Sequence, residues 1–234
     1  MTFLQLCSRL RQEVAYADSG PSAVTSQTGA HARCVDWIIE SWNEIQNRHT
    51  TWRWMRRAFN FNTTASQEDY AYGAVTDTVA SAAISRFKKW EITDRRNPPK
   101  CYLTASGVGV EYWLSYIPWD TFRALYKIST EQEGQPAHIS IGPDNKLYLG
   151  PTPDAIYTIT GEYQRSAQVL AANADTPECP SDYHMLIVYR AMEDAGFFEN
   201  GEEILQRSNL KAKRLMRQLE MDQLPMISMA GPMA

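Results

Sequence analysis

YHMLIVYRAM, residues 183–192, is the segment from which the fold of the last third of the chain can be predicted. Its side chains are apolar on most sides of a helix, and a helix of this kind is normally buried. Ser181 is placed to cap the start of the helix, and Asn200-Gly201 predicts a left-handed stop at its end. The sequence therefore predicts a buried helix over residues 182–198.

An amphipathic helix is predicted directly after it, from Glu202 to Asp222. Apolar or small residues recur there with the period of an α-helix, so one face can pack on a core. These inward positions are Ile204, Leu205, Ser208, Ala212, Leu215, Met216 and Leu219. Pro225 cannot continue a helix and marks the end of this one.

Two further helices are predicted at the start of the chain. Thr2 and Gln5 have the spacing of a capping box, and apolar residues then repeat at helical spacing as far as Val14. A polar loop over residues 17–28 leads to a second helix over residues 30–47. Its apolar stripe consists of Val35, Ile38, Ile39, Trp42 and Ile45.

Between the two helix pairs the pattern changes to a period of two, which indicates β-strands. Phe59 and Phe61 alternate there with polar asparagines. Other short runs rich in aromatic and β-branched residues cover residues 100–104, 111–117, 137–141, 146–149 and 156–165. Pro143-Asp144-Asn145 separates two of these runs and predicts a hairpin turn, hence antiparallel pairing.

Two parts of this central region are expected to differ from strands. Residues 68–85 are rich in Ala, Ser and Thr and are predicted to form a long loop. A short helix is expected with Asp120 or Thr121 as its cap. Its inward side chains are predicted to be Phe122, Leu125 and Tyr126.

These patterns predict an α+β fold, in which a helical bundle built from the N- and C-terminal helices carries an inserted antiparallel β-rich domain. The expected parts are a helical hairpin at 1–50, the β-rich insert at 51–180, the C-terminal helices at 181–222 and a C-terminal tail at 223–234.

The composition is that of an ordinary globular protein, with 234 residues, 44% of them hydrophobic and 21% charged. A formal net charge of −4 argues against a general nucleic-acid binder. No secretion signal or membrane-spanning run is evident, so we expect a protein made in the cytoplasm that contacts no membrane. The four cysteines lie far apart and predict neither a metal site nor a cofactor site: Cys7, Cys34, Cys101 and Cys179.

No catalytic motif is evident. The chain lacks a Gly-x-Ser-x-Gly elbow and a Walker glycine loop, and Gly107-Val-Gly109 lacks the third glycine of a dinucleotide site. None of its four histidines, His31, His49, His138 and His184, has a second ligand at metal spacing on one helix face. We therefore expect no enzymatic activity, although a hydrolase that uses two scattered carboxylates remains open.

Five cations cluster on the last predicted helix with no acid among them: Arg207, Lys211, Lys213, Arg214 and Arg217. One interpretation is a solvated helix face, favoured by the helix dipole. A second is a contact with an acidic neighbouring subunit or partner. Direct contact with DNA is the least favoured, because five charges neutralise few phosphates.

Two apolar segments also have alternative interpretations. WRWMRR, residues 52–57, could stack on nucleic acid, but buried Trp anchors covered by Arg stems are favoured at this junction of helix and strand. The uncharged C-terminal segment is either a frayed end or an adaptable binding strip. Its apolar residues include Leu224, Met226, Ile227 and Met229.

The order of these segments resembles the head-to-tail adaptor (connector) proteins of tailed bacteriophages. The resemblance is carried by GPTPD at 150–154, by YHMLIVYRAM and by LEMDQLP at 219–225. Residues 49–55, residues 120–123 and the first helix add to it. Residues 68–100 do not follow the pattern.

The resemblance implies a structural virion protein at the head-tail junction, assembled in the host cytoplasm. Such adaptors form a ring, expected to be twelvefold, beneath the portal protein. The ring extends the DNA channel, through which double-stranded DNA passes without specific binding, and offers a docking surface to tail or nozzle proteins. The family has no catalytic residues to transfer.

In related adaptors the C-terminal segment reaches toward the portal. The resemblance therefore makes the last helix and tail the candidate partner-binding site: Arg207, Lys211, Arg214, Arg217, Leu224, Met226, Ile227 and Met229. Two other functions remain open, a small phage-encoded hydrolase and a stand-alone regulatory binding module. A hydrolase requires a concave site with convergent carboxylates, and a regulator requires a small stable oligomer with its own ligand.

Overall fold

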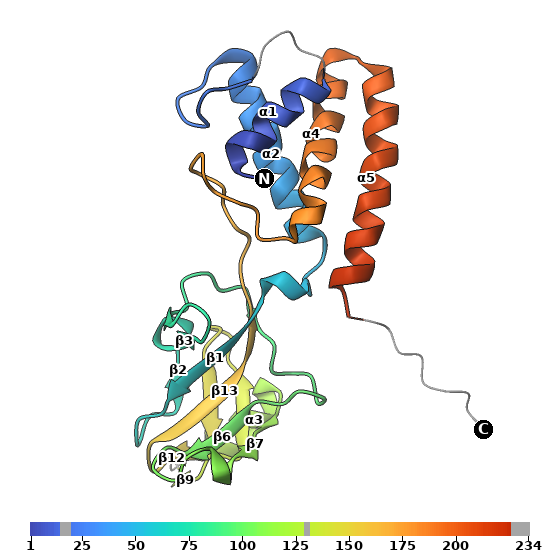
Figure 1. The fold of residues 1–234 in the computed structure, drawn as a ribbon. Helices are drawn as coiled ribbons and strands as arrows, with labels where there is room; N and C mark the ends of the chain where they lie inside the picture. Colours follow the sequence, from blue (N-terminus) through green and yellow to red (C-terminus); the bar gives the residue numbers. More distant parts are fainter. Residues whose placement is uncertain (15–19, 129–131, 226–234) are drawn as a thin grey trace, which may run out of the picture. The chain divides into compact units, whose positions relative to one another are not determined.

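The structure, a computed structural model, describes residues 1–14, 20–128 and 132–225 (Figure 1). It is an α+β fold with mainly antiparallel sheets and with helices at both ends of the chain, as predicted. The chain divides into two compact units. The helical unit comprises the described parts of Met1–Met55 and Ala167–Ala234, and the β unit comprises the described parts of Arg56–Ser166.

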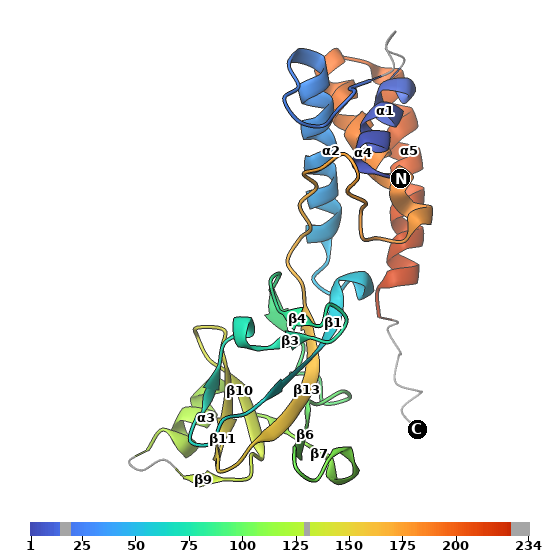
Figure 2. The same cartoon turned by 60° about the vertical axis from the view of Figure 1, so that its left-hand side comes forward.

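Four helices make up most of the helical unit: α1 (Phe3–Glu13), α2 (Gly29–Arg48), α4 (His184–Glu199) and α5 (Glu202–Gln223). Helix α4 packs against each of the other three (Figures 1 and 2). This central position explains why α4 is apolar on most sides. Among the helices within residues 1–14, 20–128 and 132–225, none has both the length and the hydropathy that a membrane span requires.

The helix ends show which local signals are reliable. The capping box at α1 is confirmed, because Thr2 and Gln5 exchange both hydrogen bonds, at 3.3 and 2.9 Å. Asn200 is confirmed as the left-handed stop of α4, with φ of 53°. The predicted cap at Ser181 is wrong. Ser181–Tyr183 forms a 3₁₀ turn instead, and α4 begins at His184 without a side-chain cap.

The core of the helical unit also contains residues from outside its helices. Trp52 and Met55, which follow α2, are fully buried in it. Leu170 and Cys179 join the same core from the segment before α4. These contacts place residues 52–55 and 167–180 in the helical unit, whereas the expected insert ran over residues 51–180.

The main sheet of the β unit is built around two long strands, β1 (Arg56–Asn62) and β13 (Tyr157–Gln164). They pair antiparallel along the whole of β1, from Arg56 opposite Gln164 to Asn62 opposite Thr158. The order in this sheet is β4-β3-β1-β13-β6-β7, with β5 also paired to β13. The shorter strands are β3 (Thr76–Asp77), β4 (Ala82–Ala83), β5 (Lys89–Trp90), β6 (Lys100–Leu103) and β7 (Tyr112–Trp113).

A second sheet has the order β2-β11-β10-β8. Its strands are β2 (Asp69–Tyr70), β8 (Ser115–Tyr116), β10 (His138–Ile141) and β11 (Leu147–Gly150). The predicted hairpin between β10 and β11 is confirmed, with Asn145 at φ of 60°. Two pairs are parallel, β8 with β10 and β9 (Glu133–Gly134) with β12 (Thr152–Pro153).

The long loop predicted at residues 68–85 is wrong. This segment contains β2, β3, β4 and a 3₁₀ turn, Tyr72–Ala74. Asp77 holds the segment in place, because its carboxylate accepts a hydrogen bond from the hydroxyl of Tyr163 at 2.6 Å and others from the backbone N–H groups of Val79 and Ala80. The partner Tyr163 is distant in sequence, so a local pattern could not reveal this arrangement.

The short helix α3 (Trp119–Tyr126) begins earlier than predicted, with Pro118 as the cap residue in place of Asp120 or Thr121. Phe122 is buried as expected, but Leu125 is 56% exposed. Trp119, Phe122 and Tyr126 lie on one face and contact each other in sequence. Leu125 therefore falls beside the inward face and not on it.

Candidate functional site

Helix α5 carries the predicted partner-binding residues, and its inward face fixes how they point. Ser208, Ala212, Met216 and Leu219 are buried against the rest of the helical unit. Near the start of α5, Leu205 packs closely on Gly196 of α4, where a Cβ atom would meet it at 2.9 Å. Because these contacts fix the rotation of α5, its cations divide into two sets.

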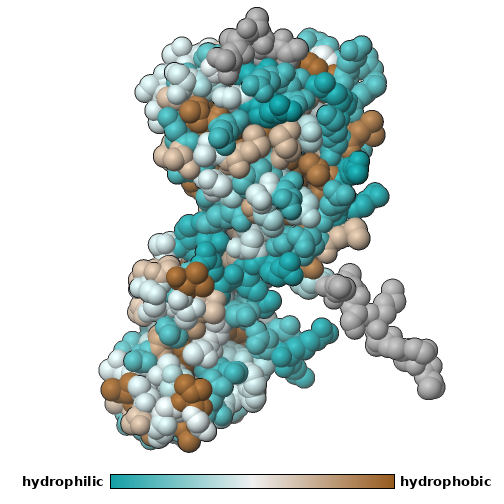
Figure 3. Space-filling view, viewed as in Figure 1, coloured by the Kyte–Doolittle hydropathy of each residue, from teal (hydrophilic) through white to brown (hydrophobic). Residues whose placement is uncertain are grey.

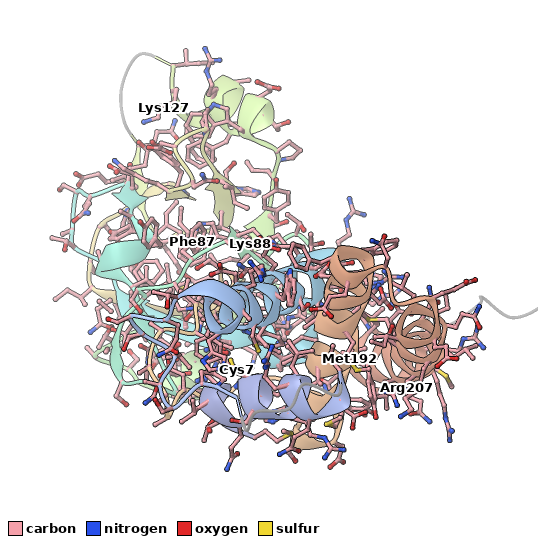
Figure 4. All side chains as sticks on the ribbon, turned by 90° about the horizontal axis from the view of Figure 1, so that it is seen from above. Cys7, Phe87, Lys88, Lys127, Met192 and Arg207 are labelled. Carbon is pink, nitrogen blue, oxygen red and sulfur yellow. The ribbon has the colours of Figure 1, made fainter. Side chains whose placement is uncertain are left out.

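Two of the five cations have partners within the helical unit. The Arg207 guanidinium donates to the backbone carbonyl of Glu13 at 2.5 Å and lies 3.5 Å from the Glu13 carboxylate. The Lys211 ammonium lies 4.9 Å from the centre of the Tyr189 ring of α4. Figure 4 shows Arg207 on α5, at the margin of the helical unit. These two residues fasten α5 to its neighbours.

The other three cations, Lys213, Arg214 and Arg217, are exposed. The described residues supply them with neither an ion pair nor a hydrogen bond. They share the outward face with two exposed apolar side chains, Leu210 at 74% and Met221 at 77%.

Leu210, Arg214, Arg217 and Met221 are spaced by four, three and four residues, which places them in one line along a helix. We call this line the outer stripe. Figure 3 shows single hydrophobic residues among hydrophilic ones on the side formed by α5. An alternation of cations and exposed apolar side chains is suited to a protein partner.

The C-terminal end of α5 lies close to the core. Gln223 is buried, and Leu224 caps the helix in an extended conformation while packing partly against the core. Of the predicted contact residues beyond it, Met226, Ile227 and Met229 lie outside the described residues.

Negatively charged side chains lie close together where α2 packs on α4. Glu40 and Glu44 of α2 lie near Glu193 and Asp194 of α4. Among the described residues, the only cation in this group is Arg190, which lies 2.9 Å from Glu193 and 3.6 Å from Glu44. Burial, followed by the charges of the three glutamates, raises the pKa of Asp194 to about 6. We call these four acids the acidic cluster. The sequence analysis missed it, because its members come from helices about 150 residues apart.

Exposed aromatic residues lie at the same end of α4. Phe197 is 72% exposed and Phe198 is 55% exposed. Phe198 contacts α2, with its ring centre 5.9 Å from that of Trp37 and 4.4 Å from the Arg33 guanidinium carbon. The surface shared by α2 and α4 thus combines negative charge with exposed apolar area.

The WRWMRR segment lies partly in the core. Trp52 is fully buried and donates its indole N–H to the carbonyl of Ile45 at 3.0 Å, and Trp54 stacks on it at 4.3 Å. Arg56 pairs with Glu162 at 2.7 Å. These contacts confirm the favoured interpretation for Trp52, which is a buried anchor.

Three of the four histidines contact specific groups in their own chain: His184, His138 and His49. His184 is buried between the Met1 amine, at 2.6 Å, and the Cys179 carbonyl, and burial followed by the charge of that amine lowers its pKa. His138 contacts the hydroxyl of Tyr126 at 2.6 Å. His49 contacts Glu220 at 2.9 Å across α2 and α5. These contacts give the three histidines roles in packing.

A hydrolase of the paired-carboxylate kind needs two carboxylates that face one hollow. The lining of one hollow of the β unit, of about 510 Å³, contains a single carboxylate, Asp94, which accepts the backbone N–H of Arg96. Another, of about 320 Å³, is lined by Glu111 and Glu162, but each is already ion-paired to a cation of the β unit. Within the described residues neither hollow presents two unpaired carboxylates to one substrate.

The structure defines an α+β protein with helices at both ends of the chain. The model of the SU10 adaptor protein family matches residues 1–233, and the chain belongs to this family. No curated protein matches the chain. The resemblance to phage adaptors is thus confirmed, and the chain is a bacteriophage structural adaptor that interacts with other head and tail proteins of the virion.

Proposed function

We propose that the chain is a head-to-tail adaptor that forms a ring beneath the portal of a tailed phage. The ring is expected to be twelvefold, to extend the DNA channel and to give tail or nozzle proteins a docking surface. The observation that carries this proposal is the family match over residues 1–233.

In this proposal the helices from both ends of the chain act as one bundle, and the β unit is the inserted domain that it carries. The apolar core shared by α1, α2, α4 and α5 supports the first part. The continuous pairing of β1 with β13 supports the second, because these strands begin and end the β unit. The bundle supplies the ring, and the insert supplies the surface for the tail.

We assign contact with the portal to the end of α5 and the residues after it. Leu224 leaves the helix in an extended conformation, and Met226, Ile227 and Met229 follow in a segment without charge. Methionine side chains are unbranched and polarisable, so they fit irregular partner surfaces. Arg207 and Lys211 have partners in their own chain and act by positioning α5.

The channel function is compatible with the charge of the chain. Double-stranded DNA must pass without being held, and tight phosphate binding needs many cations. The net charge is −4, although five of the cations are concentrated on α5. With these five set aside, the rest of the chain has 18 Lys and Arg against 27 Asp and Glu, a net charge of −9.

Electron microscopy of the purified protein mixed with its portal tests this proposal. The expected result is a ring stacked coaxially on the portal, with the portal alone as the control. A protein that stays dispersed in the presence of portals, and that is missing from purified virions, would contradict the proposal.

A further inference from the structure

The outer stripe of α5 is a helix face without a partner in the described chain. Leu210 and Met221 at its ends are about three-quarters exposed, although apolar side chains of this size are usually covered. Arg214 and Arg217 between them have no ion pair with any described residue. A partner for this face must therefore offer negative charge and apolar area along one line.

The acidic cluster and its neighbours offer that combination. Four carboxylates, Glu40, Glu44, Glu193 and Asp194, face one cation, Arg190, so the cluster has an excess of negative charge. The exposed ring of Phe197 follows three residues after Asp194 on α4. The two surfaces of the same chain are thus complementary in charge and in apolar content.

The two surfaces cannot satisfy each other within one chain. Helix α4 lies between α2 and α5 in the views of Figures 1 and 4, and the outer stripe points away from α4, because the opposite face of α5 is buried. A contact between them requires two chains. It joins unlike surfaces, and such a head-to-tail contact generates a ring when the rotation between copies closes.

We propose that the outer stripe of α5 in one copy docks on the α2/α4 surface of a second copy, with Arg214 and Arg217 facing the acidic cluster. This inference rests on the proposed ring and names the contact that builds it. The charges orient the two copies and speed their encounter, whereas Leu210, at one end of the stripe, contributes burial against Phe197 at the aromatic end of α4.

Charge reversal on each side tests the contact. One variant carries Arg214→Glu and Arg217→Glu, and the other carries Glu40→Lys and Glu44→Lys. Each alone places like charges across the contact, so we expect at least a tenfold loss of rings on portals, counted by electron microscopy. Arg95→Glu with Arg96→Glu, an exposed cation pair in the β unit, is the matched control and should assemble like the wild type.

Mixing the two reversed variants in equal amounts distinguishes a contact between copies from a contact with the portal. In the mixture each acidic stripe can meet a basic α2/α4 surface, and each basic stripe an acidic one, so alternating rings should form again. A stripe that binds the portal would not be rescued in this way. Unchanged assembly of the Arg214→Glu, Arg217→Glu variant, or failure of the mixture, overturns the inference.

A cysteine trap gives an independent result if a reversed variant folds poorly. The four native cysteines are buried, so Leu210→Cys with Phe197→Cys in one chain introduces the two accessible thiols. Mild oxidation of assembled rings should then produce a ladder of linked chains on a non-reducing gel. Assembled rings that give no ladder while wild-type rings form normally would overturn the contact but leave the adaptor function standing. Absence of rings from the wild-type protein would contradict both the contact and the adaptor function.

Discussion

The helical unit and the β unit are stabilised in different ways. The core of the helical unit is mostly aliphatic and sulfur-containing, with residues such as Ile38 and Met192 completely buried. The core of the β unit is rich in aromatic residues whose polar atoms have partners, as when Trp90 donates to the Asn145 carbonyl at 2.8 Å. The first kind of core depends on the shape of apolar side chains, and the second depends also on specific hydrogen bonds between distant segments.

Truncation inside the helical core should have the largest effect on stability. Ile38→Ala, Leu186→Ala and Ile187→Ala each leave a cavity at a side chain that is at most 1% exposed. Each should lower the free energy of unfolding by about 2–5 kcal/mol. Urea unfolding followed by circular dichroism measures the loss.

Ile39→Ala is the matched control, because Ile39 is only partly buried, although the sequence predicted it at the centre of the α2 stripe. Its loss should be clearly smaller than that of Ile38→Ala. Equal losses at the two positions would contradict the packing described for α2.

Removal of one hydroxyl should have the next largest effect, in the β unit. Tyr163→Phe leaves the buried Asp77 without a donor that it contacts at 2.6 Å, and we expect a loss of about 1–3 kcal/mol. Tyr148→Phe is the control, since its hydroxyl contacts Asp144 in a more exposed position. Tyr148→Phe should lose only a fraction of the unfolding free energy that Tyr163→Phe loses.

The difference in stability between the wild type and Tyr163→Phe should depend on pH. Burial alone would raise the pKa of Asp77, but the hydrogen bonds from Tyr163 and from the backbone hold it below its ordinary value of 3.8. A carboxylate with a lowered pKa stabilises the fold above its ordinary value and loses that effect as the pH falls through the folded value. The gap between wild type and Tyr163→Phe should therefore be widest near neutral pH. A gap that stayed constant down to pH 3 would show that the hydroxyl acts only by packing.

Asp194→Asn should change the stability less than Tyr163→Phe does, and it should raise the stability and not lower it. The pKa of Asp194 is raised to about 6, so the folded protein binds a proton more readily than the unfolded chain between that value and 3.8. The stability of the wild type should therefore rise as the pH falls through this window. The Asn variant should be slightly more stable at pH 7 and lack this rise, as measured by Tm from pH 4 to 8. Asp36→Asn, which removes an exposed carboxylate of α2 outside the acidic cluster, is the matched control and should keep the rise that Asp194 causes.

The sequence predicted the helical unit better than the β unit for a physical reason. Helix periodicity and caps are local, so Thr2, Asn200 and the bounds of α2 and α5 could be predicted. Several strands are only two residues long and exist through distant pairing, as β3 does through β1. No local pattern can identify them.

The sequence also predicted the local features of the candidate site but not its contacts between distant segments. The sequence identified the five cations of α5, but it could not show which of them have partners in the same chain. Arg207 contacts Glu13, which is 194 residues away. The acidic cluster was missed for the same reason, since α2 and α4 must pack before its four carboxylates come together.

Deletion of residues 226–234 should have the smallest effect on stability and a large effect on assembly. The apolar positions with helical period end before residue 226, so the Tm should stay near that of the wild type. Portal binding should weaken, because Met226, Ile227 and Met229 are lost from the proposed contact. Ordering such a segment on a partner costs conformational entropy, so its apolar contacts must exceed that cost for the segment to contribute. Replacing the same nine residues with a Gly/Ser segment is the control for chain length, and it should bind portals as weakly as the deletion does. Undiminished binding of either variant would show that these residues are a frayed end and would move the portal contact to the β unit.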